Sequence, residues 1–170
     1  MHQRFYNRNL ATILLENIQE IGRPTYTAEE EAFARALQKE AGYPVRGMDC
    51  PLALVDAEKD ELRASSSDRG DVCLVVPTGQ ISLPVWVPGS PAHHWTVASA
   101  AATSIAHKGI TAGAKAVVFT VGDLIFDADL LRRIKDEFAE LARLRPYRPF
   151  LPGDVMPPLD FYAGGTSPVT

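Results

Sequence analysis

The chain has 170 residues, which is the length of one ordinary domain. Hydrophobic residues make up 46% of it, so wholesale disorder is excluded. With 17 Lys and Arg against 21 Asp and Glu, and no basic cluster, the charge does not support a nucleic-acid-binding or anionic-membrane-binding surface. No uninterrupted apolar run approaches the roughly 18 residues of a membrane span. The first seven residues lack an apolar signal-peptide core, and Cys50 and Cys73 have no metal-type spacing, so a cytoplasmic setting is expected.

Two helices are predicted in the N-terminal part of the chain. Apolar residues recur at steps of three and four from Leu10 to Ile21, and Gly22 can end that helix. Thr27 with Glu30 then forms a capping-box pattern, which predicts a second helix that Gly42 ends.

Two strands are predicted in the middle of the chain. Residues 72–76 are continuously apolar and rich in valine, which is typical of a strand buried on both faces of a sheet. A second strand is predicted from Ile81 to Val87, although Pro84 excludes a fully paired central position. A rigid polar loop is expected at 88–96.

The C-terminal part is again predicted to be helical. One helix is expected from about Ile110 to Phe126, and Asp127 can cap another that carries apolar residues at helical spacing up to Leu141. From Pro146 onward the chain is rich in proline, so an extended tail is expected over 146–170, after a single folded unit over 1–145.

This order of elements favours an α/β fold, but an incomplete one. Four or more helices flank two or three strands, and a strand such as 72–76 needs neighbours on both edges and cover on both faces. The sequence therefore predicts one portion of a larger helix-flanked sheet.

The loop at 88–96 carries the best candidates for chemistry, His93 and His94. Imidazole is a common zinc ligand, and the loop follows a predicted strand, where α/β sheets tend to place ligands. Adjacent residues of an extended chain point in opposite directions, so the two histidines are not expected to share one ion. The alternative is that one ring packs on Trp95 while the other is solvated.

Two further positions have both a functional and a structural interpretation. Asp68 and Asp71 bracket Gly70, where a carboxylate can bind a ligand or cap a turn. His107 and Lys108 precede the predicted helix that begins near Ile110. Because cations oppose the dipole at a helix start, a compensating partner is expected for them. For His107 two interpretations stay open, a buried, hydrogen-bonded side chain and a role near an active site.

Four separated motifs, taken in order, resemble one family of enzymes. They are SSDRGDV at 66–72, VPT at 76–78, GSPAHHW at 89–95 and SIAHKG at 104–109. Together with residues 9–34, they resemble the C-terminal part of the catalytic domain in the aminobenzoyl-glutamate branch of the zinc amidohydrolases, which are related to aminoacylase and glutamate carboxypeptidase. The resemblance covers nearly all of residues 7–150.

The resemblance implies a metallopeptidase-type catalytic domain in which two divalent metal ions polarise an amide carbonyl and activate water. The position that matches a late metal-ligating histidine of the family is His93. Asp68 matches a loop that lines the site, which implies a supporting role, and His107 matches a motif of the aminobenzoyl-glutamate branch. The implied substrate is a small amide of a glutamate-like carboxylate.

Several parts of the family pattern are missing from this sequence. No histidine has Asp two places later, and the lid domain is absent. The Glu-Glu pair that supplies base and ligand is also missing, because Glu29 to Glu31 belong to a predicted helix start. No catalytic base can therefore be assigned, and one histidine falls short of the three protein ligands of a catalytic zinc.

Two functions remain open at this point. The first is a C-terminal fragment or subunit of a metal-dependent amidohydrolase, inactive alone, which holds zinc or another divalent metal only with a complementing N-terminal chain or by self-association. The second is a non-catalytic relic or interaction module that keeps part of the fold.

Overall fold

The structure is a computed structural model that describes residues 4–50 and 67–156. Helices make up 58% of this part, and no strand occurs in it. The predicted α/β fold is therefore wrong for the described residues. Six helices replace it: α1 (Arg8–Ile21), α2 (Ala28–Glu40), α3 (Arg69–Cys73), α4 (Trp95–Ala101), α5 (Ser104–Phe126) and α6 (Ala128–Leu144).

Side-chain caps set the starts of three long helices, and the sequence predicts two of them, at Thr27 and Asp127. Asn7 accepts a hydrogen bond from the Leu10 amide at the start of α1, and Asp127 accepts one from Leu130 at the start of α6. Thr27 and Glu30 form both halves of a capping box on α2. The predictions of α1, α2 and α6 are thereby confirmed, whereas α5 begins six residues before the expected Ile110.

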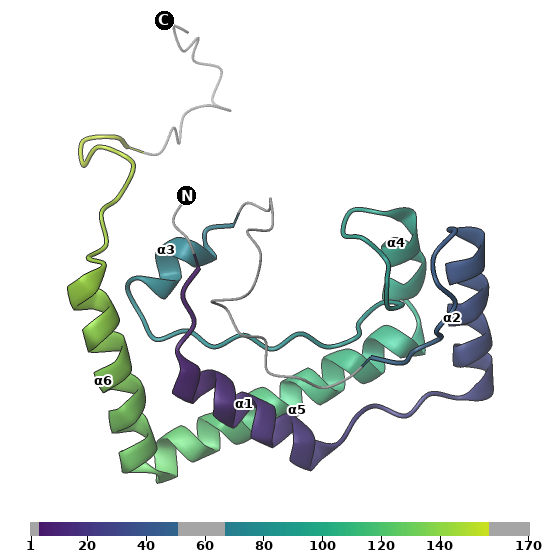
Figure 1. Cartoon of the computed structure of the whole chain (residues 1–170), viewed down its shortest axis with the longest axis horizontal. Coiled ribbons are helices and arrows are strands. Elements are labelled where there is room, and N and C mark those ends of the chain that lie inside the picture. Colours follow the sequence, from purple (N-terminus) through teal and green to yellow (C-terminus); the bar gives the residue numbers. More distant parts are fainter. Residues whose placement is uncertain (1–3, 51–66, 157–170) are drawn as a thin grey trace, which may run out of the picture.

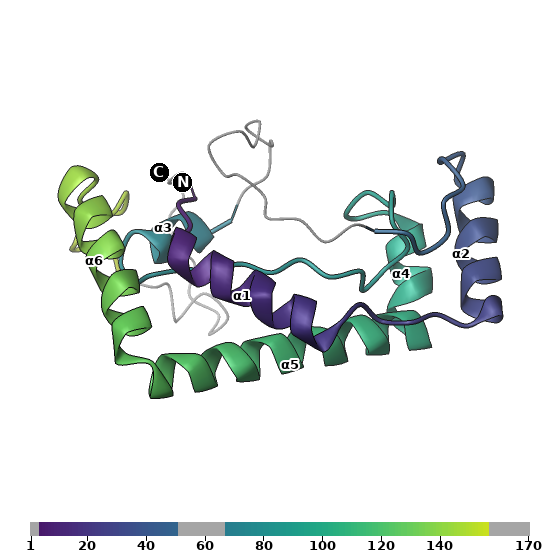
Figure 2. The same ribbon diagram turned by 60° about the horizontal axis from the view of Figure 1, so that its bottom comes forward.

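α5 is the longest helix and extends along the length of the molecule (Figures 1 and 2). α1 packs on it, α3 and α6 lie at one end, and α2 and α4 lie at the other. By length and composition α5 could cross a membrane, although the sequence has no uninterrupted apolar run of that length. Only 22% of its most apolar stretch is buried.

The described core includes two small clusters of buried residues. One joins α2, α4 and the start of α5 through Ala34, Leu37, Met48, Val87, Ala100 and Ile105. The other joins α1 to the middle of α5 through Ile18, Ala112 and Ala116. In addition, Glu30 of α2 pairs with Lys108 of α5, and the Pro84 backbone lies close to Gly109 of α5.

The predicted strand at 72–76 is instead the end of α3 followed by a turn. Its amides bond locally, as when Leu74 donates to the Asp71 carbonyl at 3.1 Å and Val76 donates to the Val72 carbonyl at 3.0 Å. Each strand amide needs a partner across a ladder, and no other strand exists in the described parts of the chain to supply one. Cys73 and Leu74 are buried, but Val72, Val75 and Val76 are about half exposed.

The second predicted strand, 81–87, is an irregular segment that lies against α5. Gly109 makes the close approach possible, because a Cβ there would come within 2.5 Å of the Pro84 carbonyl oxygen. Ile81 and Leu83 pack against the α1–α5 cluster. This segment thus meets a helix where the sequence predicts a neighbouring strand.

Candidate functional site

A pocket of about 410 Å³, here called the linker pocket, lies between the α1–α2 connection and the N-terminal half of α5. On one side the chain turns from α1 through Gly22 to Pro24. On the other side, steps of three and four residues along α5 bring one helix face to the pocket. That face supplies Ser104, His107, Lys108, Thr111, Ala112 and Lys115.

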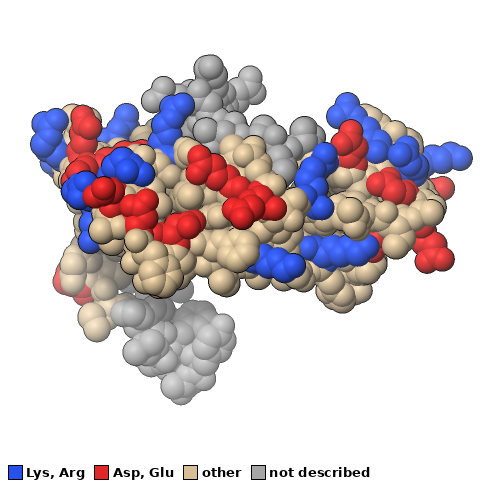
Figure 3. Space-filling view, turned by 90° about the horizontal axis from the view of Figure 1, so that it is seen from below, with Lys and Arg blue, Asp and Glu red and all other residues tan. Residues whose placement is uncertain are grey.

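The linker pocket is lined by cations and hydroxyls. Arg23, Lys108 and Lys115 line it, and no carboxylate of the described chain does. Arg23 is turned toward the Cys50 carbonyl, its hydrogen-bond acceptor, and lies 3.5 Å from Asp49. The Lys115 ammonium makes no hydrogen bond or ion pair with residues 4–50 or 67–156, so its charge is available to a ligand. On the face of the molecule that Figure 3 shows, acidic and basic side chains are interspersed.

Lys108 is held by Glu30 of α2, whose side chain is only 9% exposed. The Lys108 Nζ lies 2.6 Å from Glu30 Oε2, and the Ser104 hydroxyl donates to Glu30 Oε1 at 2.5 Å. Hydrogen bonds from Lys108, Ser104 and the Thr27 amide lower the pKa of Glu30 to about 2. Glu30 is therefore the compensating partner that the cations near the start of α5 were expected to need.

Tyr26 lies beside the same ion pair. Lys108 Nζ is 5.7 Å from the centre of its ring, which is within the range of a cation–π contact. The Tyr26 hydroxyl is buried and has no hydrogen-bond partner in the described structure, and burial together with the Glu30 charge raises its pKa. Lys108 is thus held in place by Glu30 and Tyr26, whereas Lys115 pairs with neither of these residues.

His93 and His94 lie in the turn before α4 and differ sharply in environment. His94 caps α4: its Nδ1 lies 2.9 Å from the Thr96 hydroxyl, and its ring meets Tyr43 and Trp95 at centroid distances of 5.9 and 5.6 Å. His93 is exposed, with φ at 63°, a left-handed conformation that costs energy for a residue other than glycine. The expectation that one histidine packs on Trp95 while the other is solvated is confirmed.

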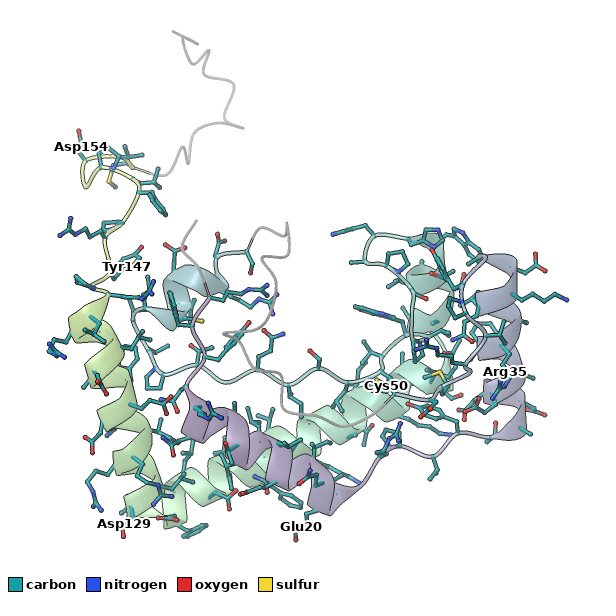
Figure 4. All side chains as sticks on the ribbon, in the orientation of Figure 1. Glu20, Arg35, Cys50, Asp129, Tyr147 and Asp154 are labelled. Carbon is teal, nitrogen blue, oxygen red and sulfur yellow. The ribbon has the colours of Figure 1, made fainter. Side chains whose placement is uncertain are left out.

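α2 holds this histidine turn in place through Gln38, which is almost completely buried. Its amide nitrogen donates to the carbonyls of Gly47 and Pro88, both at 3.0 Å, and its oxygen accepts from the Gly47 amide at 2.8 Å. The connection after α2 and the chain leading to His93 are therefore tied to one side chain. Figure 4 shows Cys50 and Arg35 at this same end of the molecule, far from Tyr147.

Asp68 lies at the opposite end, just before α3, and is exposed. Its side chain makes no capping hydrogen bond, so the expected turn-capping role is absent there. No hydrogen bond, ion pair or ring contact of the described structure joins any two of Asp68, His93 and His107. The structure thus does not bring the three predicted site residues together.

These residues do not make a metal centre by themselves. Within the described ranges no three His, Cys, Asp or Glu side chains come together in a way that could hold an ion. His93 offers one exposed imidazole, while a catalytic zinc takes three protein ligands and water.

The sequence analysis missed Arg23 and Lys115 as parts of a pocket. Their positions depend on how α1, its following turn and α5 pack together, which no local pattern encodes. The spacing of His107, Thr111 and Lys115 by four residues was visible in the sequence, and it places them on one helix face.

Comparison with known proteins gives one informative match. The chain is 30% identical over 175 aligned positions to the B subunit of p-aminobenzoyl-glutamate hydrolase from Escherichia coli K12. The alignment covers 89% of this chain and 36% of the length of that protein. No family model and no solved structure matches the chain. The match confirms the resemblance that the four motifs predict, and it supports a correspondence with the C-terminal part of that protein.

Proposed function

We propose that this chain is the C-terminal part of a metal-dependent amidohydrolase that cleaves the amide bond of p-aminobenzoyl-glutamate or a related compound. The observation that carries the proposal is the match itself, which extends over 89% of this chain and only 36% of a protein named as a hydrolase subunit. In this proposal the remaining part of the enzyme is a separate chain, and this chain has no hydrolytic activity alone.

The proposed contribution of His93 is one metal ligand. Its imidazole is exposed at the start of α4 and is free of the contacts that occupy His94. Because the described residues supply no second and third donor around it, the proposal assigns the other ligands to the complementing chain. For the same reason no step of the hydrolysis is assigned to residues of this chain.

The linker pocket is the proposed carboxylate-binding part of the enzyme. Lys115 lines it without a compensating carboxylate from the described residues, and an anionic group gains most from a cation that no protein anion already neutralises. A glutamate-like product or substrate carries such groups. Asp68 remains a prediction, since the structure places it at the other end of the molecule.

One observation supports a cellular location, and another favours a second candidate function. Cys50 and Cys73 are both free thiols, which suits the cytoplasm that we propose as its location. A non-catalytic interaction module is the second candidate function, and the many apolar side chains exposed on α5 favour it.

A zinc titration of the chain alone, followed by Trp95 fluorescence, tests the role of His93. Trp95 is half exposed and lies beside the histidine turn. We expect a weak response that His93→Ala abolishes and His107→Ala retains, together with no release of glutamate from p-aminobenzoyl-glutamate. A response that survives His93→Ala would overturn the proposed ligand, and hydrolysis by the chain alone would overturn the need for a complementing chain.

A further inference from the structure

One face of α5 is apolar and uncovered along most of the helix. Its inward side, which includes Gly109, Ala112 and Ala116, is buried. The opposite side carries apolar residues at helical spacing. Five of them are 48–68% exposed: Ile110, Val117, Val118, Val121 and Ile125. We call these five residues the α5 stripe, and Ala114 continues it.

The α5 stripe differs from the outer faces of the other long helices. The exposed side of α6 carries Arg132, Lys135, Asp136 and Glu140, as expected for a helix in water. In Figure 2, α5 forms one edge of the molecule, and the other described helices lie to one side of it. A contiguous apolar face of this kind on a soluble protein marks a surface that binds something.

A lipid bilayer is a poor occupant for the α5 stripe. The inner side of α5 is tied to α1, since Asn17 Nδ2 donates to Asp123 at 2.7 Å and lies 3.0 Å from the Thr120 hydroxyl. α1 carries Glu16 and Glu20, so α5 cannot enter a bilayer without taking charged residues with it. The net charge of −4 also gives no attraction to anionic lipid.

The match to the hydrolase points to a protein occupant. This chain corresponds to 36% of the matched E. coli protein, so the larger part of that protein has no counterpart here. A helix that is buried on both sides in a complete enzyme would expose one apolar side when its neighbouring part is missing. Both the length of the missing part and the uninterrupted apolar face agree with this origin.

We propose that the α5 stripe is the surface on which the remaining part of the hydrolase docks, through an apolar helix or sheet face of its own. This inference rests on the proposed function, because it takes its partner from there. It assigns to α5 one contact with the complementing chain, in addition to the metal ligands that the proposed function takes from that chain at His93.

The test measures association of the full chain with a shortened E. coli protein, the hydrolase B subunit without the segment that this chain matches. Val118→Lys/Ile125→Lys adds two charges to the α5 stripe, and Leu144→Lys is the matched control, since Leu144 is 62% exposed on α6. All these side chains point into solvent, so circular dichroism should show unchanged helicity. We expect the double variant to lower the association constant at least tenfold and the control to leave it unchanged.

Other outcomes overturn the inference in distinguishable ways. If the unmodified chain does not bind the shortened E. coli protein, the proposed function fails and the inference fails with it. If it binds and the double variant binds equally well, only the α5 stripe is excluded. If the chain self-associates and the double variant abolishes this, the occupant of the α5 stripe is a second copy of the chain. If the chain binds vesicles of phosphatidylcholine and phosphatidylserine, the occupant is a membrane.

Discussion

Glu30 connects α2 and α5 with a single carboxylate. It completes the capping box of α2, accepts a hydrogen bond from Ser104 at the start of α5, and pairs with Lys108 one turn later. Lys108 is thereby fixed at the edge of the linker pocket, and Lys115 is left as the cation that no described residue pairs with there. The electrostatics of the pocket therefore depend on a residue that does not line it.

Replacing Glu30 by Gln should change how stability depends on pH. The pKa of Glu30 is lowered from 4.5 to about 2 in the folded chain, so its ionised form stabilises the fold fully above about pH 4.5 and less as the pH falls toward 2. The free energy of unfolding, measured by urea denaturation between pH 7 and pH 3, should fall less steeply in Glu30→Gln than in the unmodified chain.

Glu29→Gln provides the control for this prediction, because Glu29 is exposed in the same first turn of α2. It should retain the acid-side loss of stability. Equal pH profiles for Glu30→Gln and the unmodified chain would show that the pairs with Lys108 and Ser104 do not stabilise the fold.

At the level of elements, the caps were predictable and the strands were not. Asn7, Thr27 and Asp127 act within four residues of their targets, so local sequence determines where α1, α2 and α6 begin. A strand depends on a partner elsewhere, and residues 72–76 and 81–87 find none in the described structure. Similarly, the stacking of a histidine on its neighbour Trp95 is local, whereas the Glu30–Lys108 pair joins residues 78 positions apart.

Two glycines of α5 offer a matched pair for testing how the irregular segment packs. A Cβ at Gly109 would lie 2.5 Å from the Pro84 carbonyl oxygen, a backbone atom, while a Cβ at Gly122 would meet nothing within 4 Å. Gly109→Ala should therefore destabilise the chain by about 1–3 kcal/mol. Gly122→Ala should stabilise it by about 0.5–1 kcal/mol, since alanine is the better helix former.

Thermal or chemical unfolding monitored by circular dichroism gives both values. A gain in stability for Gly109→Ala equal to that for Gly122→Ala would show that residues 83–85 do not lie against α5.

On the scale of the whole molecule, the described residues have little core and many exposed apolar side chains. Two small buried clusters join α1, α2, α4 and α5, while much of α5 faces outward. The predicted site residues are also spread out, with Asp68 at one end and His93 at the other. Both features are expected if part of the folded core and part of the site belong to another chain. From the sequence, the uncovered surface was predicted at the strand 72–76, whereas the structure has no strand there and exposes the apolar face of α5.

The most direct test of this account measures release of p-aminobenzoate from p-aminobenzoyl-glutamate. The E. coli hydrolase is prepared with a B subunit that lacks the segment that this chain matches, and this chain is added to that preparation. The intact hydrolase serves as the positive control. We predict hydrolysis only in the mixture, its loss with His93→Ala, and its retention with His2→Ala, a histidine that the proposal does not use. An inactive mixture beside an active intact enzyme, or full activity with His93→Ala, would contradict the account.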